Sequence, residues 1–237
     1  YIIRTKEKSE INFSMAKQVF NDYIKQFDEK DGSILLKITH TYQVVNLSEY
    51  IAKEQGLDEE SINLAKVIAL LHDIGRFKQV TVQRSFSDKT FDHAEYGNQI
   101  LFEENLIRKF IKTDKYDEVI RKAIYNHNKY KIEDGLSETE ELQCKIIRDA
   151  DKLDNFRVKD ENNFEDSFPK IRDESKQETN DIIADLEKSS ISDTVYNDFL
   201  AHKCIKLDDR KTLLDYWICV LSLIHISEPT RHLRISY

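Results

Sequence analysis

Ile68-Ala-Leu-Leu-His-Asp-Ile-Gly-Arg76 places a histidine and an aspartate, His72 and Asp73, at the end of one of the most apolar runs in the chain. A buried imidazole beside a buried carboxylate costs several kcal/mol unless both groups are hydrogen-bonded or bound to a metal. The doublet therefore predicts that other polar side chains, or metal ions, meet it inside the folded protein.

Other residues of metal-ligand type lie on segments of helical periodicity and border an apolar stripe. They are His40, His93, His127 and Asp151. A single histidine on such a stripe is usually an ordinary core residue. Three of the seven histidines have this placement, however, and a fourth, His72, belongs to the His-Asp doublet. The combination favours a site, and we expect all six side chains to point inward.

Four imidazoles and two carboxylates, without thiolate, suit a catalytic rather than a structural metal site. Manganese or iron is the first choice, and magnesium, cobalt or zinc are the alternatives. Six ligands exceed what one ion with an open position needs, so we expect two divalent ions bridged by Asp73. His40, His72 and Asp151 would hold the first ion, and His93 and His127 the second. Water between two such ions loses a proton near neutral pH and becomes a nucleophile.

Cations near these ligands are candidates for substrate binding. Arg76 lies one helical turn past His72, Lys152 follows Asp151, and Lys78 is a third candidate. We expect Arg76 and Lys152 to contact a phosphate group and to assist Asp73 in catalysis. Ordinary solvated surface charge is the alternative for all three cations. Asp154 could orient a ligand or form an ion pair with its neighbours.

The ligand pattern resembles that of the HD-domain superfamily of metal-dependent phosphohydrolases. That pattern is a single histidine, a His-Asp doublet and a distant aspartate, here His40, His72-Asp73 and Asp151. The strings that carry the resemblance are Leu71-His-Asp-Ile-Gly-Arg76, Arg148-Asp-Ala-Asp-Lys-Leu-Asp-Asn155, Asp92-His-Ala-Glu-Tyr-Gly97 and Asn126-His-Asn128. The last two correspond to the extra histidines of the binuclear branch. The resemblance covers about residues 30–160 and implies an all-α HD-domain helical bundle.

Three classes of function are compatible with these residues. The resemblance makes a phosphohydrolase the first expectation, acting on a small phosphorylated metabolite such as a nucleotide. A small branch of the superfamily holds two irons with a similar ligand set and activates dioxygen, so a diiron oxygenase is the second. A non-catalytic ligand-binding module is the third, and it is the weakest because every ligand position is filled.

Composition narrows the class of partner. The chain has 237 residues and a net charge of −8, which disfavours general nucleic-acid binding because phosphate-backbone affinity needs excess Lys and Arg. Five Gly, two Pro and 34% charged residues favour long helices. Three widely spaced cysteines and the lack of an apolar run long enough for a bilayer predict a cytoplasmic protein without membrane contact. The sequence does not predict an oligomeric state.

The local pattern also predicts where elements begin and end. We expect Ser33 to cap the His40 helix, Asp58 and Asp92 to cap the helices that follow them, and Gly75 to end the His72 helix. Residues 80–91 are expected to form a loop beside the site.

Three regions are expected along the chain. Residues 1–160 should form the HD domain with a flanking helix, and residues 161–221 a smaller helical C-terminal extension. Amphipathic segments at residues 182–186, 195–201 and 213–221 are expected to be the helices of this extension. Residues 222–237 resemble translated sequencing-adapter read-through, in which case His225 and His232 are excluded from the site; an ordinary tail is the alternative. The first residue is Tyr1, so we expect the natural start to precede it.

Overall fold

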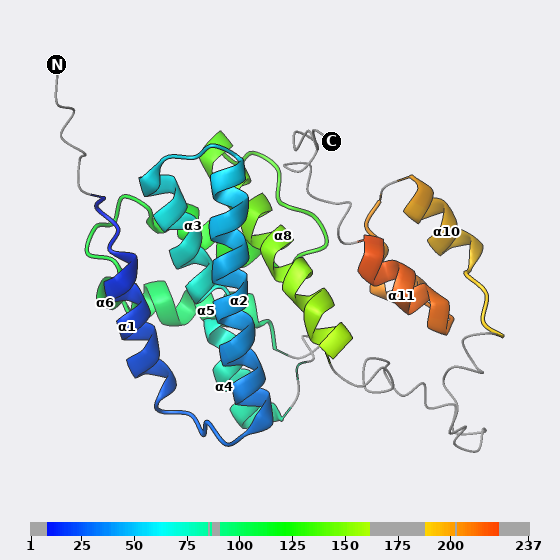
Figure 1. Ribbon diagram of the computed structural model, residues 1–237, viewed down its shortest axis with the longest axis horizontal. Coiled ribbons are helices and arrows are strands. Elements are labelled where there is room, and N and C mark those ends of the chain that lie inside the picture. The colour runs from blue at the N-terminus through cyan, green and yellow to red at the C-terminus, as the bar shows by residue number, and fades with distance from the viewer. Residues whose placement is uncertain (1–8, 85, 87–90, 162–187, 202, 223–237) are drawn as a thin grey trace. The chain divides into compact units, whose positions relative to one another are not determined.

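The computed structural model describes residues 9–84, 86, 91–161, 188–201 and 203–222 (Figure 1). These residues form helices and connecting segments without strands, so the prediction of an all-α fold is confirmed. They divide into two compact units, and the division falls after Asp151, inside a helix. The predicted domain limit near residue 160 stays a prediction. Each unit is described by itself below.

The first unit is built from helices that pack around a single apolar core (Figure 1). In chain order its helices are α1 (Phe13–Ile24), α2 (Gly32–Glu54), α3 (Glu59–Leu71), α4 (Ile74–Gln83), α5 (His93–Asn98), the π-helix η1 (Gln99–Glu103), α6 (Ile107–Phe110), α7 (Asp117–Asn126) and α8 (Glu138–Glu161), whose last ten residues belong to the second unit.

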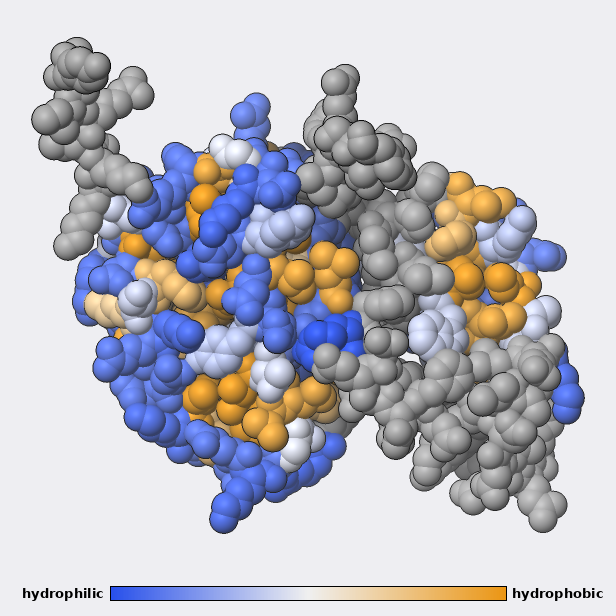
Figure 2. All heavy atoms as spheres, viewed as in Figure 1, coloured by the Kyte–Doolittle hydropathy of each residue, from blue (hydrophilic) through white to orange (hydrophobic). Residues whose placement is uncertain are grey.

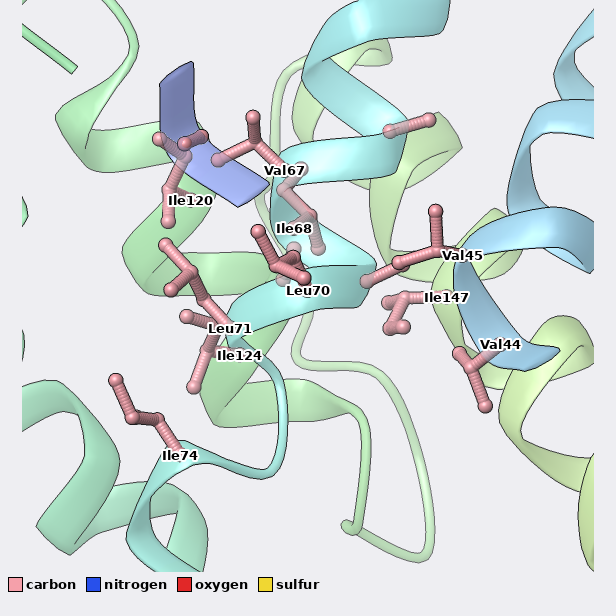
Figure 3. Packing of buried hydrophobic residues seen from close by; sticks show 14 of the residues in the cluster. Val44, Val45, Val67, Ile68, Leu70, Leu71, Ile74, Ile120, Ile124 and Ile147 are labelled. Carbon is pink, nitrogen blue, oxygen red and sulfur yellow. The ribbon is translucent and has the colours of Figure 1, made fainter. Parts of the chain in front are cut away.

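The C-terminal end of helix α3 lies deep in this core. Its last five residues, Val67–Leu71, are all completely buried (Figure 3). A helical segment that is apolar on every side has to be enclosed by other elements, and α3 packs against α1, α2 and α7. Each fully buried aliphatic side chain contributes roughly 1.5–3 kcal/mol. Because His72 and Asp73 follow α3 directly, this packing fixes them in the interior.

Side-chain caps fix the starts of several helices. Asp58 accepts a hydrogen bond from the backbone N–H of Ser61 (2.8 Å), and Asp92 accepts one from that of Ala94 (2.9 Å), so both predicted caps are confirmed. The prediction for Ser33 is wrong. Asp31 caps α2 and accepts a hydrogen bond from the N–H of Ser33 (2.9 Å).

Gly75 does not end a helix, contrary to the prediction. It is the second residue of α4, and a Cβ atom there would lie only 2.2 Å from the carbonyl oxygen of His93. Glycine is needed because the backbones of α4 and α5 approach each other this closely. The loop predicted for residues 80–91 also begins later than expected, since α4 continues to Gln83.

The second unit contains α10 (Asp193–Leu200), the 3-10 helix η3 (Leu207–Asp209) and α11 (Leu213–Ser222). Helices α10 and α11 pack together around a small core of Val195, Ile205 and Cys219. Helical segments predicted at residues 195–201 and 213–221 are therefore confirmed. The segment predicted at residues 182–186 and the tail after residue 222 lie outside the described residues.

The visible face of the first unit is mostly hydrophilic, with apolar patches between charged side chains (Figure 2). Among the described residues, every helix is too short or too polar to cross a lipid bilayer.

We predict that Gly75→Ala lowers the free energy of unfolding by about 1–3 kcal/mol, because the new methyl group would overlap the His93 carbonyl oxygen. Urea unfolding monitored by circular dichroism measures the change. Gly32→Ala is the matched control, since a Cβ at this helical glycine meets no atom within 4 Å. Equal stability of the two variants would show that the approach of α4 to α5 does not require glycine.

Candidate metal centre

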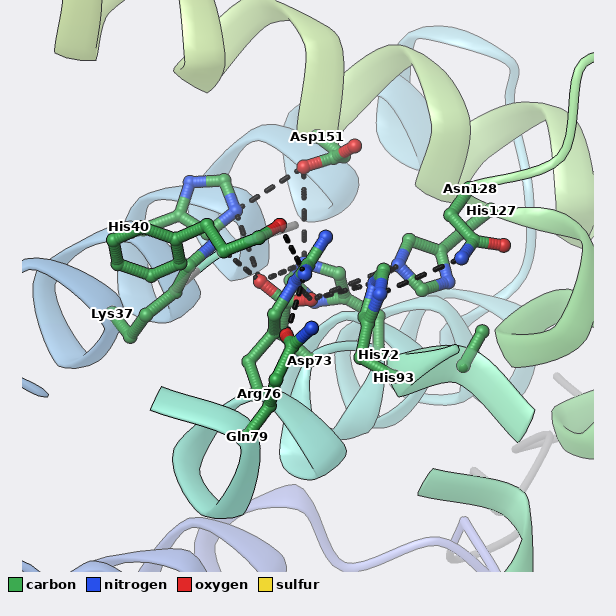
Figure 4. Close-up of polar contacts among 12 residues, drawn as sticks. Lys37, His40, His72, Asp73, Arg76, Gln79, His93, His127, Asn128 and Asp151 are labelled. Carbon is green, nitrogen blue, oxygen red and sulfur yellow. Dashed lines mark hydrogen bonds and ion pairs between the residues drawn. The ribbon is translucent and has the colours of Figure 1, made fainter. Parts of the chain in front are cut away.

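All six predicted ligands come together inside the first unit (Figure 4). They come from five places in the chain: α2, the junction between α3 and α4, the start of α5, the end of α7, and α8. Each is at most 5% exposed. They are His40, His72, Asp73, His93, His127 and Asp151.

Asp73 lies at the centre of this group, and its two carboxylate oxygens face different histidines. Its Oδ2 atom is 3.7 Å from Nε2 of His40 and 3.6 Å from Nε2 of His72. Its Oδ1 atom is 3.2 Å from Nε2 of His93 and 3.7 Å from Nε2 of His127. One carboxylate is thus shared by two sets of imidazoles.

Asp151 completes the first set. Its Oδ1 atom lies 3.2 Å from Nε2 of His40 and 3.9 Å from Nε2 of His72. Metal bonds of about 2.0–2.2 Å allow two ligand atoms of one ion to be at most about 4.4 Å apart. The measured separations satisfy this limit in both sets.

Two of the histidines are oriented by a hydrogen bond from Nδ1, the ring nitrogen that does not face Asp73. Nδ1 of His72 donates to the carbonyl oxygen of Ala69 (2.7 Å), and Nδ1 of His127 donates to that of Ile124 (2.6 Å). Because a carbonyl oxygen only accepts, each Nδ1 carries the proton and each Nε2 presents its lone pair to the cluster. Nε2 of His72 is buried and has no hydrogen-bond partner among the described residues. A divalent metal ion fits this atom.

The protonation states also suit metal ions. Burial lowers the pKa of His72 to about 3 and also lowers that of His127, so both imidazoles are neutral at pH 7. Burial alone would raise the pKa of Asp73, but the Lys37 ammonium, 2.7 Å from its Oδ2 atom, holds it well below its usual value. Neutral imidazoles and an ionised carboxylate are the forms that bind metals.

The segment that carries His127 is held by a buried cation. Nη1 of Arg148 donates to the carbonyl oxygens of Asn126 (2.7 Å) and Lys129 (2.6 Å), at the end of α7. The last carbonyl groups of a helix lack intrahelical partners, and a cation there is favourable. Arg148 therefore fixes the turn from which His127 projects.

The predicted cations have different positions. Arg76 lies beside the centre, with Nε 3.7 Å from Oδ1 of Asp73, while its Nη1 donates to Oε1 of Gln79 and to the carbonyl oxygen of Phe86. Lys78 is exposed on α4. Lys152 is partly exposed and is the first residue of the second unit.

Two more side chains, neither of them a predicted ligand, have clear contacts. The Lys37 ammonium lies 2.7 Å from Oδ2 of Asp73, and we did not predict this contact. Its only signal in the sequence is its position three residues before His40, on the same face of a helix. Asp154 is buried and pairs with Nε of Arg157 (2.6 Å), which agrees with the ion-pair alternative for this residue.

Comparison with known proteins gives the family. The model of the HD domain matches residues 38–155, a range that includes all six ligands. The chain belongs to the HD-domain superfamily. The predicted family resemblance is confirmed.

One similar solved structure is described as a predicted HD superfamily hydrolase from an uncultured Thermotogales bacterium. It is 27% identical over 62% of this chain and 71% of its own, with a TM-score of 0.39. No curated protein matches the chain.

We predict that Asp92→Asn lowers the free energy of unfolding by about 1 kcal/mol at pH 7, after allowance for solvent screening. Burial opposes ionisation of Asp92, but Lys129 and the N–H groups of α5 lower its pKa from 3.8 to about 2. Its charge therefore stabilises the fold above pH 3.8, and this contribution is lost as the pH falls through 2. The difference between variant and wild type in urea unfolding should shrink as the pH falls below about 4.

Asp134→Asn is the control and should change the free energy of unfolding little at any pH, because this side chain is 87% exposed and an exposed ion pair contributes little. A difference for Asp92→Asn that stays constant down to pH 3 would contradict the assigned role of its charge.

Proposed function

We propose that this protein is a metal-dependent phosphohydrolase that cleaves a phosphoester in a small phosphorylated metabolite. The observation that carries the proposal is the arrangement around Asp73, whose two oxygens each face a separate pair of imidazoles. Membership of the HD-domain superfamily, a group of metal-dependent phosphohydrolases, supports the same chemistry.

Two divalent ions are part of the proposal. His40, His72, Asp73 and Asp151 would hold one, and Asp73, His93 and His127 the other. Bound there, the ions would supply an activated water near neutral pH and would offset negative charge on the phosphoryl group. The chain itself keeps Asp73 ionised and aims the lone pairs of His72 and His127 into the centre.

Nucleotides are the first substrate class to test. Lys37 and Arg76 place two cations beside Asp73. Their positive charge attracts a phosphate group to the centre although the protein as a whole has a net charge of −8. The Phe86 ring lies 5.5 Å from the Lys37 ammonium, and Phe86 is 40% exposed. An exposed aromatic ring next to phosphate-binding cations offers a surface on which a base can stack.

The function is tested by loading the metal-free protein with manganese under anaerobic conditions and measuring phosphate release from a panel of nucleotides and other phosphoesters. We expect turnover without oxygen. Asp73→Asn removes the shared negative charge and should lower the rate by more than about 100-fold. Substitutions of groups that only orient metal ligands cost up to about 100-fold, and the change of a ligand itself should cost more. Asp134→Asn is the control, because this exposed aspartate pairs only with nearby Lys131 among the described residues.

Two results would contradict the proposal. One is a wild-type protein that releases no phosphate from any phosphoester yet consumes dioxygen when loaded with iron, which would indicate the oxygenase branch. The other is an Asp73→Asn protein that retains wild-type turnover and metal content.

A further inference from the structure

We propose that Lys37 binds the phosphoryl oxygens of the substrate, and that its contact with Asp73 is the resting position from which it does so. The inference rests on the proposed function and names a residue that lies just outside the HD match at residues 38–155. It concerns binding rather than the chemical step.

The first argument is the position of the ammonium. Lys37 Nζ lies 2.7 Å from Oδ2 of Asp73, the same oxygen that faces His40 and His72. A divalent ion on that oxygen would place two positive charges within a few ångströms of each other, in a region of low dielectric constant. An anion that contacts both charges removes the repulsion, and a phosphoryl group has several oxygens with which to do so.

The second argument is access. The side chains of the six ligands are 0–8% exposed, whereas those of Lys37 and Arg76 are 13% and 12% exposed. These two side chains, which lie beside Asp73 (Figure 4), are therefore more accessible than the ligands. A substrate that approaches Asp73 from their side meets Lys37 and Arg76 first.

The third argument is that Lys37 has hydrogen-bond donors left for a phosphate. Nη1 of Arg76 donates to Oε1 of Gln79 (2.6 Å) and to the carbonyl oxygen of Phe86 (2.8 Å), so this guanidinium is already engaged by two protein acceptors. An ammonium has three donors, and the contact of Lys37 with Asp73 uses one of them. Lys37 can keep this bond, or exchange it, while other N–H groups bind phosphate.

The alternative role for Lys37 is to neutralise the buried charge of Asp73 and nothing more. The two roles differ once metal ions are bound, because the ions then neutralise Asp73 themselves. A lysine that serves only as a counter-ion is dispensable in the loaded protein. A lysine that binds phosphate is not.

The test measures the affinity of the manganese-loaded protein for inorganic phosphate by isothermal titration calorimetry. We expect Lys37→Met to weaken phosphate binding at least about tenfold, the loss typical of a charge-assisted hydrogen bond. The metal content of the variant, measured by inductively coupled plasma mass spectrometry, should equal that of the wild type. Methionine keeps most of the unbranched apolar stem of the side chain and removes its charge.

Lys66→Met is the matched control and should bind phosphate like the wild type. The Lys66 side chain is 16% exposed, its ammonium lies 3.1 Å from Glu49, and it stands over the ring of Phe13. Its burial, ion pair and aromatic contact thus match those of Lys37, but its partners are not metal ligands.

Equal phosphate affinity in Lys37→Met and the wild type would overturn the inference, as would a wild-type protein that does not bind phosphate. A Lys37→Met protein that loses its metal ions would also contradict it, because the bound ions should keep Asp73 ionised without Lys37. The titration involves no turnover. Failure of the hydrolysis assay is therefore distinct from failure of this inference.

Discussion

The carboxylate of Asp73 is the interaction on which the rest of the structure depends. It is almost completely buried, yet its environment keeps it ionised. A buried charge of this kind is costly unless it is paired from several sides. The Lys37 ammonium is one such partner, and metal ions held between the carboxylate and the four imidazoles would supply the others.

The helices of the first unit bring these partners to one carboxylate. The complete burial of α3 from Val67 to Leu71 places the doublet in the interior. Gly75 lets α5 approach α4, so His93 reaches Oδ1 of Asp73. Arg148 binds the carbonyl groups at the end of α7 and thereby holds the turn that carries His127. The burial of α3, the close approach at Gly75 and the hydrogen bonds of Arg148 therefore all position ligands of the same site.

The sequence predicts the helical fold and the inward position of all six ligand-type residues, because apolar periodicity reveals which face of a helix is buried. It does not predict Lys37. In the sequence, a lysine one turn before a histidine cannot be distinguished from a solvated surface charge. Only the folded structure, in which α2 packs against the doublet, shows that Lys37 contacts Asp73. Gly75 was misinterpreted for a similar reason. Glycine marks both helix ends and close approaches, and only the position of His93 distinguishes the two.

The central claim is that Asp73 is shared by two metal ions. The most direct measurement is anomalous X-ray diffraction at the manganese absorption edge, from crystals of the manganese-loaded protein. The account predicts two peaks, one within about 2.2 Å of ligand atoms of His40, His72 and Asp73, and one equally close to Asp73, His93 and His127. A single peak, or a second peak that Asp73 does not contact, would contradict it.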